Sequence, residues 1–487
     1  MAINLSRNTK VYFTTNVSAA TGIITDANSG FTASNTFEVQ VQDGYSFAQT
    51  TNQTTIQVSE AGSTPSRGQR AFNTSLAPVD WSFSTYIRPY IASTFISPAE
   101  KVLWNALLGE STLDDTGLAI TSLTRVAGTA PVIAATASPF ATIVTATPIQ
   151  RTVSGTAAAV VVNDVINLNG FADPSLNESV LVSAVTGTGP TTYTVEFATA
   201  PATTVVATPT VGSAKAYTGQ WAKSTTANSN FSYVSTMGAG KNQLQKFGLI
   251  FVVDNAVYGV DNCALDQVSI DFGLDAIAMC AWTGKGTALK QLANIPGSAL
   301  SSTGTPIATL AQTSANYITN KLSTLKLQSN IGGDEYTGST KYTIPITGGN
   351  ITIANNLNYL TPVNLAVVNT PIGYYTGQRA VTGNVTAYLR TGGTNDSGTL
   401  LSTLLAAASS TTEPKYKVQL EMGGASAANR VEFEMPGVVL QIPAVNVADI
   451  VATTINFSAQ GFDPSLTTAQ TFDITKNNEL VIRYFSS

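Results

Sequence analysis

The chain has 487 residues, of which 43% are hydrophobic and only 11% are charged, and its formal net charge is -5. This composition does not suit a disordered chain, and the acidic balance argues against binding nucleic acid through clustered Lys and Arg. Histidine is absent, so the commonest general base, catalytic-triad member and zinc ligand is missing.

The N-terminal part predicts strands separated by one long polar connection. Residues 1–8 lack the apolar region of a signal peptide, so we expect synthesis in the cytoplasm. Strands are expected at 10–14 and 36–42. The segment 43–73 is polar apart from a strand-like island at 55–58, and a connection of this length is usually functional or docks onto a partner. No apolar run in the sequence is long enough to span a bilayer.

A strand and a short helix follow this connection. Residues 81–88 alternate, with Trp81 and Phe83 on one face, which predicts a half-buried strand. Residues 100–109 carry an apolar stripe at helical spacing and end on Gly109, a natural C-cap. A capping box that begins at Ser97 supplies the start. The sequence therefore predicts a short amphipathic helix after the strand.

The same unit recurs at residues 383–408, which indicates an internal duplication. Tyr86 matches Tyr388, and Trp282 in a later strand of the first copy matches Phe457. The interval between these markers is 196 residues in the first copy and 69 in the second, so the first copy holds 127 extra residues. Most of them must belong to the segment from about 126 to 217, which is rich in Thr, Ala, Val and Pro, is poor in charge, and predicts a small barrel or sandwich.

The sequence contains no recognisable catalytic or metal-binding constellation. The glycine-rich segment 235–242 lacks the first Gly and the final Ser or Thr of a phosphate loop. The acidic pairs at 114–115 and 334–335 lack the alternate spacing of a calcium loop. Cys263 and Cys280 have no metal-ligand spacing; a disulfide between them is conceivable, but their apolar setting favours buried free thiols. We therefore expect no enzyme activity and no cofactor.

Several runs resemble bacteriophage tail tube (major tail) proteins, in particular those in which the tube fold is duplicated within one chain. The resemblance covers most of 1–125 and 220–487 and is absent from about 127 to 219. In the first half it rests on 6–13, 60–62, 67–68, 81–90 and 103–104, and in the second half on 320–322, 344–349, 359–362, 371–373 and 381–389.

This resemblance implies a mostly β fold with two tandem β-sandwich or split-barrel domains, each with a short flanking helix, plus the inserted β domain. It also implies trimeric, pseudo-hexameric rings that stack into the tube for genome passage. The implied partners are further copies of the chain, the tape measure, terminator and baseplate proteins and, in a contractile tail, a sheath protein. The expected location is the phage virion, after assembly in the host cytoplasm. The expected domains are a first tube domain at 1–126 and 220–290, the insertion at 127–219, a linker at 291–316 and a second tube domain at 317–487.

Two sets of residues are candidates for function in such a tube. Polar faces of alternating strands are expected to line the lumen without attracting DNA: Gln267, Ser269, Asp271, Thr454, Asn456 and Ser458. Apolar residues of the long connections are expected to offer a strand edge to the next ring: Ile56, Val58, Ile351 and Ile353. The alternatives are a ring-forming tail terminator or baseplate hub, which would stop at one ring, and a β-rich surface adhesin, which would need an export signal.

Overall fold

In the computed structural model the chain is mostly β, which confirms the predicted fold class. The structure describes residues 9–25, 31, 35–56, 70–89, 91–92, 95–96, 100–108, 118–125, 132–133, 143–144, 150–155, 165–169, 179–186, 192–196, 215–218, 221–222, 231–234, 244–254, 256–292, 317–329, 341–365, 367–393, 395–408, 415–423, 429–446, 451–459 and 479–485.

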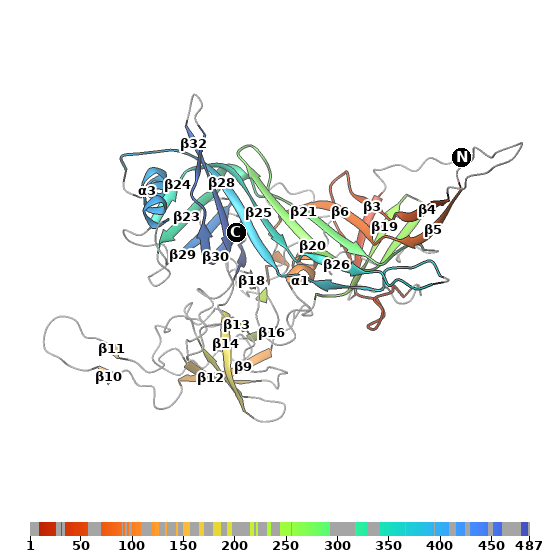
Figure 1. Cartoon of the computed structure of the whole chain (residues 1–487). Helices are drawn as coiled ribbons and strands as arrows, with labels where there is room; N and C mark the ends of the chain where they lie inside the picture. The colour runs from red at the N-terminus through yellow and green to blue at the C-terminus, as the bar shows by residue number, and fades with distance from the viewer. Residues whose placement is uncertain are drawn as a thin grey trace, which may run out of the picture.

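One long antiparallel sheet, the central sheet, runs through the molecule (Figure 1). Its strand order is β3 (Ser46–Ala48), β6 (Val79–Tyr86), β21 (Met279–Gly286), β20 (Ala256–Gly273), β25 (Ile346–Ala354), β28 (Ala380–Tyr388), β32 (Ala452–Ala459) and β31 (Ala444–Asn446). β6 has the predicted alternation, because Trp81 and Phe83 are buried whereas Ser82 and Ser84 are half-buried.

Two smaller sheets cover the apolar face of the central sheet. The first cover sheet comprises β2 (Thr36–Val39), β1 (Thr9–Thr14), β19 (Phe247–Val253), the first half of β20, and β22 (Ala288–Gln291). The second comprises β24 (Lys341–Ile344), β23 (Thr324–Ser329), β29 (Lys415–Met422), β30 (Arg430–Leu440), β33 (Val481–Phe485), β18 (Phe231–Val234) and β17 (Trp221–Ala222).

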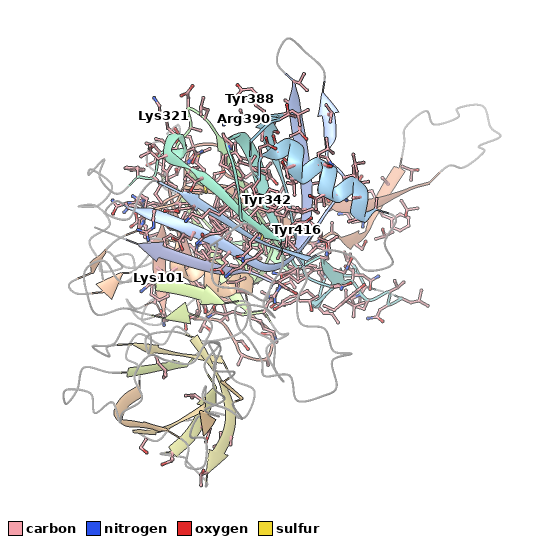
Figure 2. All side chains as sticks on the ribbon, turned by 90° about the vertical axis from the view of Figure 1, so that its left-hand side faces the viewer. Lys101, Lys321, Tyr342, Tyr388, Arg390 and Tyr416 are labelled. Atoms are coloured by element: carbon pink, nitrogen blue, oxygen red, sulfur yellow. The ribbon has the colours of Figure 1, made fainter. Side chains whose placement is uncertain are left out.

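The layers share one continuous apolar core. The rings of Phe47 and Phe251 stack at 4.5 Å between the central sheet and the first cover sheet. Figure 2 shows Tyr342 and Tyr416 close together within the second half of the molecule, where both are buried. β20 and β30 pass from a cover sheet into the central sheet, which is how strands form the corner of a closed sandwich.

The two copies have the same pairing scheme. In the first copy β1 pairs with β2 and β19, β20 pairs with β19, β21 and β22, and β6 pairs with β3 and β21. In the second copy β23 pairs with β24 and β29, β30 pairs with β29, β32 and β33, and β28 pairs with β25 and β32. Each pairing of the first copy therefore has a counterpart in the second.

The register of these pairings corrects the sequence alignment of the copies. Tyr86 lies opposite the first residue of β21, and Tyr388 lies opposite the first residue of β32. The predicted match of Trp282 with Phe457 is therefore wrong by two residues, although the face of the strand is the same.

This misalignment arises because the equivalent large aromatic ring is on different strands in the two copies. In the first copy Trp81 of β6 lies opposite Gly284 of β21, whereas in the second copy Gly383 of β28 lies opposite Phe457 of β32. A Cβ on either glycine would overlap the facing ring. Both copies thus place one large ring over one glycine, but on opposite strands.

The two helices follow equivalent strands but differ in burial. The helix predicted at 100–109 is present as α1 (Lys101–Leu108), but all eight of its residues are buried, so it has no face exposed to solvent as an amphipathic helix would. Trp104 packs edge-on against Trp282 of β21 at 4.9 Å. In α3 (Ser397–Ala407) Leu400 and Leu404 are buried but Leu405 is 54% exposed, so this helix covers the core with one face.

The acidic residues that precede the two helices have opposite environments. Glu100 is buried and its Oε1 accepts a hydrogen bond from the Tyr484 hydroxyl at 2.5 Å, while Tyr484 accepts from Trp104 Nε1 at 2.7 Å. Burial raises the pKa of Glu100 to about 7 against the lowering effect of that hydrogen bond. Asp396 instead caps α3, and hydrogen bonds from the backbone of Thr399 and of a neighbouring glycine hold its pKa below the ordinary value.

The low-charge segment of the first copy forms a closed antiparallel barrel below the central sheet (Figure 1). Around the barrel the order is β9 (Leu118–Arg125), β12 (Gln150–Gly155), β15 (Thr192–Glu196), β14 (Ser179–Thr186), β13 (Val165–Asn169) and β16 (Lys215–Thr218). The barrel therefore begins at Leu118, before the predicted boundary at 127, because β9 closes it against β12 and β16. The division of the whole chain into domains stays a prediction.

Two hairpins project together at one end of the molecule, on the right in Figure 1. They are β4 (Thr51–Ile56) with β5 (Arg70–Leu76) and β26 (Leu357–Leu360) with β27 (Gly373–Thr376). The remaining elements are short: β7 (Ile91–Ala92) with β8 (Phe95–Ile96), β10 (Val132–Ile133) with β11 (Ile143–Val144), and the single turn η5 (Asn320–Leu322).

Candidate functional site

One face of the central sheet is polar across both copies. Residues that pair in an antiparallel ladder share a face. One row across the sheet consists of Asp271, Asn350, Asn384 and Asn456, and the next row of Ser269, Thr352, Thr382 and Ser458. Gln267 and Thr454 lie two residues from members of these rows and so share the same face. All six residues predicted to line a lumen therefore lie on one surface, here called the polar face.

Hydrogen bonds tie neighbouring strands together on the polar face. Nδ2 of Asn350 donates to Ser269 Oγ at 2.7 Å and to Asp271 Oδ1 at 2.5 Å. Thr352 Oγ1 donates to Asn350 Oδ1 at 2.9 Å. The two bonds from Asn350 join β20 of the first copy to β25 of the second, and the bond from Thr352 orients Asn350 within β25. Sequence reasoning missed Asn350 and Thr352, although the alternation at 350–354 is visible in the sequence.

The charged residues of the polar face all come from the first copy. Among the residues that the strand registers place on this face they are Asp80, Asp271 and Lys285, and Lys285 lies 3.1 Å from Asp80. The registers place Thr382, Asn446 and Ser458 at the three corresponding positions of the second copy. The polar face thus carries a net charge of about one negative unit per chain and is otherwise made of short neutral groups.

The opposite face of the central sheet packs into the core. Val268, Ile270 and Trp282 are fully buried there, and α1 lies against this side. The helix α1 therefore lies on the core side of the central sheet and does not cover the polar face. This leaves the polar face as the open side of the sheet.

The residues predicted to contact a neighbouring ring are only partly available. Ile351 and Ile353 are 1% and 0% exposed, and β25 is paired on both sides, by β20 and by β28. The expectation that they offer a strand edge is therefore wrong. Ile56 is the last residue of β4, and Val58 lies outside the described residues.

The exposed apolar residues of the second long connection lie after β25 and were missed. The turn between β26 and β27, with its flanking residues, has seven exposed large side chains, here called the apolar loop: Leu360, Val363, Leu365, Val367, Val368, Ile372 and Tyr375. The signal in the sequence is a run of large apolar residues at 363–375 among turn-forming Asn, Thr and Pro.

The two outermost strands of the central sheet each pair along one edge only, within the described residues. At one end β3 pairs with β6, and at the other β31 pairs with β32. By register β3 corresponds to the part of β25 around Ile351, and β31 corresponds to the part of β20 around Ile270. Those two parts pair with each other inside the chain, where they form the junction between the copies.

The described residues hold no group of three or more His, Cys, Asp or Glu side chains placed to bind a metal. Cys263 and Cys280 are both buried and free, and burial raises the pKa of each thiol well above its ordinary value. None of the helices in the described part of the chain is long and apolar enough to cross a membrane.

The chain is similar to a known phage protein. The chain is 26% identical over 472 residues to "Tail tube protein pb6" of Escherichia phage T5, a match that covers 94% of this chain and 73% of that protein. No family model matches the chain. The similarity confirms the resemblance to phage tail tube proteins and supports a structural role in a phage tail.

Proposed function

From this similarity to phage tail tube proteins, we propose that three copies of the chain close a ring around a pore, and that stacked rings form the tail tube through which the genome passes. Each chain supplies two homologous units, so a ring of three chains has six. The partners are then other copies of the chain, the tape measure protein in the pore, and the terminator and baseplate proteins at the tube ends.

The observation that carries this proposal is the junction between the two copies. Within the chain Ser269 pairs with Thr352, and Ile270 pairs with Ile351. Repeating this junction between chains joins β31 of one chain to β3 of the next, and its register places Ala444 opposite Ala48 and Val445 opposite Phe47.

The exposure of the side chains at these edges supports the same contact. Val445 is 42% exposed, whereas Ile270, its counterpart, is fully buried in the junction within the chain. A free strand edge with exposed apolar residues invites pairing, and a closed ring removes every such edge. The proposed contact therefore buries Val445 and pairs the strand edges of β3 and β31 that the single chain leaves unpaired within the described residues.

The size of the closed sheet suits a conduit. Eight strands per chain give about 24 strands in a ring, and a spacing of about 4.8 Å gives a circumference of about 115 Å and a diameter of about 37 Å. We place the polar face on the inside, because the helices and the core occupy the other side. Short neutral groups and a small negative charge then face the DNA, which lets a polyanion pass without binding.

Paired cysteines test the proposed ring. Ala48→Cys together with Ala444→Cys should link neighbouring chains after mild oxidation, so that denaturing gels show covalent dimers and trimers. Ser269→Cys with Thr352→Cys is the matched control and should link only within a chain. Ala48→Cys with Val445→Cys places the thiols on opposite faces of the sheet and should not link.

Two results would count against the proposal. The closed ring is ruled out if the chain stays monomeric at all concentrations by sedimentation. It is also ruled out if the Ala48→Cys/Val445→Cys variant crosslinks as well as the Ala48→Cys/Ala444→Cys variant. Rings that never lengthen into tubes in electron micrographs would instead favour a terminator or a baseplate hub.

A further inference from the structure

The apolar loop is the largest group of exposed apolar side chains in the described part of the chain. Val363 and Leu365 are 92% and 96% exposed, and five further large side chains of the loop are at least half exposed. A contiguous apolar patch on a soluble protein usually marks an interaction site, since leaving it in water is unfavourable.

Backbone hydrogen bonds hold this loop in place. Asn369 accepts at its carbonyl from the Leu76 amide at 2.8 Å and donates its own amide to the Thr74 carbonyl at 3.2 Å. Its side-chain oxygen accepts from the amide of Asn364 at 2.8 Å. The apolar loop is therefore held against β5 of the first copy by backbone hydrogen bonds. A loop that is already ordered loses less conformational entropy when it binds a partner.

A second exposed apolar patch lies at the opposite end of the same strands. It consists of Leu274, Ile277 and Leu322, which are 56%, 39% and 56% exposed, and is here called the end patch. A bridge between Ile277 and Thr319 joins the β20–β21 turn to the segment before β23. The end patch thus spans the junction between the two copies.

The pairing of β20 with β25 places the two surfaces on opposite ends of this junction. Gly273, next to the end patch, pairs with Gly348, and Gln267 pairs with Ala354, from which the chain continues into β26 and the apolar loop. The two ends lie six residue steps apart along β20, a distance of roughly 20 Å. Figure 2 looks onto the end opposite the hairpins.

We propose that the apolar loop of one ring seats on the end patch of the next ring, and that this contact fixes the rotational register of the stack. The inference rests on the proposed ring and adds the residues that join one ring to another. Two different surfaces at opposite ends of one molecule make a head-to-tail contact, which repeats without closing and so yields a filament.

The rotational register of the stack follows from the difference between the hairpin of the first copy (β4 and β5) and the hairpin of the second copy (β26 and β27). In the first copy residues 51–55 are all exposed and are Thr, Asn or Gln. The sequence from 56 to 69 adds Ile56 and Val58 as large apolar residues, and β5 adds one exposed apolar side chain, Phe72, which is 52% exposed. A group of seven exposed apolar side chains therefore occurs once per chain, three times in a ring, and a ring turned by one unit would set the mainly polar first hairpins where apolar loops belong.

Charged substitutions on the two surfaces test this contact. Val363→Asp with Leu365→Asp, and separately Leu274→Asp with Leu322→Asp, should reduce tube yield at least tenfold in electron micrographs while three-chain rings persist by native mass spectrometry. Thr54→Asp with Thr55→Asp adds the same charge to the first hairpin and should leave tube yield within twofold of the unmodified protein.

A crosslink gives a second measurement that does not depend on those variants folding. Leu365→Cys with Leu322→Cys should form covalent links between chains in tubes and none in isolated rings. Normal tubes from the Val363→Asp/Leu365→Asp variant, or no crosslink in tubes, would overturn the inference while leaving the ring intact. Failure of the unmodified chain to form rings would instead remove the proposed function itself.

Discussion

The two copies of the duplicated unit share the strand pairings of the central and cover sheets but differ in the side chains that pack on them. The first copy puts an aromatic ring on β6 over Gly284, and the second puts one on β32 over Gly383. The first buries Glu100 before its helix, and the second exposes Asp396 as a helix cap. The shared pairing shows that the backbone ladder and the alternation of faces define the unit, whereas the side chains that fill it can be exchanged between strands.

The largest expected effect comes from breaking the aromatic–glycine pair of the first copy. Trp81→Gly removes a ring that is 2% exposed and should lower the free energy of unfolding by about 3–5 kcal/mol, because it leaves a cavity. Gly284→Phe alone should also destabilise, since the new side chain overlaps Trp81. Denaturant unfolding measures both.

The double variant decides whether the two copies are alternative solutions of one packing problem. Trp81→Gly with Gly284→Phe recreates the arrangement of the second copy and should recover stability, with a coupling of about 0.5–3 kcal/mol relative to the sum of the single changes. Strict additivity in this double-mutant cycle would mean that the two pairs are unrelated.

The next effect is a pH dependence that only the first copy should show. The native pKa of Glu100, about 7, lies above the ordinary value of 4.5, so between these pH values the folded state holds a proton that the unfolded state has released. The stabilising contribution is complete below pH 4.5 and is lost as pH rises through 7, and it amounts to roughly 3 kcal/mol. Unfolding curves measured from pH 4.5 to 8 should show this decline.

Glu100→Gln is the matched variant, because a neutral amide oxygen can still accept the hydrogen bond from Tyr484. Its stability should be nearly flat over that pH range. Asp396→Asn should leave the decline unchanged, since the pKa of Asp396 is lowered and its titration lies below the range. A decline that survives in Glu100→Gln would assign the pH dependence to another group.

Much of this architecture follows from periodicity in the sequence. The period-two pattern gave the strand at Trp81, the polar face at Gln267, Ser269 and Asp271, and the repeat of the unit near Tyr388. These are local patterns, and alternation alone determines which residues share a face. Whether the polar face lines a lumen stays a prediction.

The features that sequence reasoning missed depend on long-range pairing. Alternation at Ile351 and Ile353 could not tell that β25 is paired on both sides, so buried residues were taken for a free edge. The start of the barrel was missed because β9 is recognised only by its partners β12 and β16, which lie about 30 and 100 residues later in the chain. The match of Trp282 with Phe457 followed the aromatic residue rather than the backbone register.

A smaller effect is expected from changing the charge of Asp271, whose carboxylate accepts a hydrogen bond from the neutral side chain of Asn350 on the polar face. Asp271→Asn makes the first copy resemble the second, where Asn446 lies at this position, and should change neither folding nor tube assembly. Asp271→Lys should also assemble, but its tubes should retain double-stranded DNA at low salt, because three added cations per ring attract phosphates. Filter binding of labelled DNA to washed tubes measures this, and equal retention by both variants would place Asp271 away from the pore.

The smallest effect is expected from removing the barrel, which has no counterpart among the described residues of the second copy. Its first and last strands are paired, with Leu118 opposite Ala216, so the chain enters and leaves the barrel at neighbouring points. Deleting 118–218 and joining the ends with a short Gly/Ser linker should therefore cost little, because the loop that replaces the barrel spans only about 5 Å. We expect the shortened chain to form rings and tubes with unchanged yield and a thinner outer profile in electron micrographs. A shortened chain that folds but makes no tubes would show that the barrel belongs to the tube wall, and the two copies would then not be sufficient for the tube.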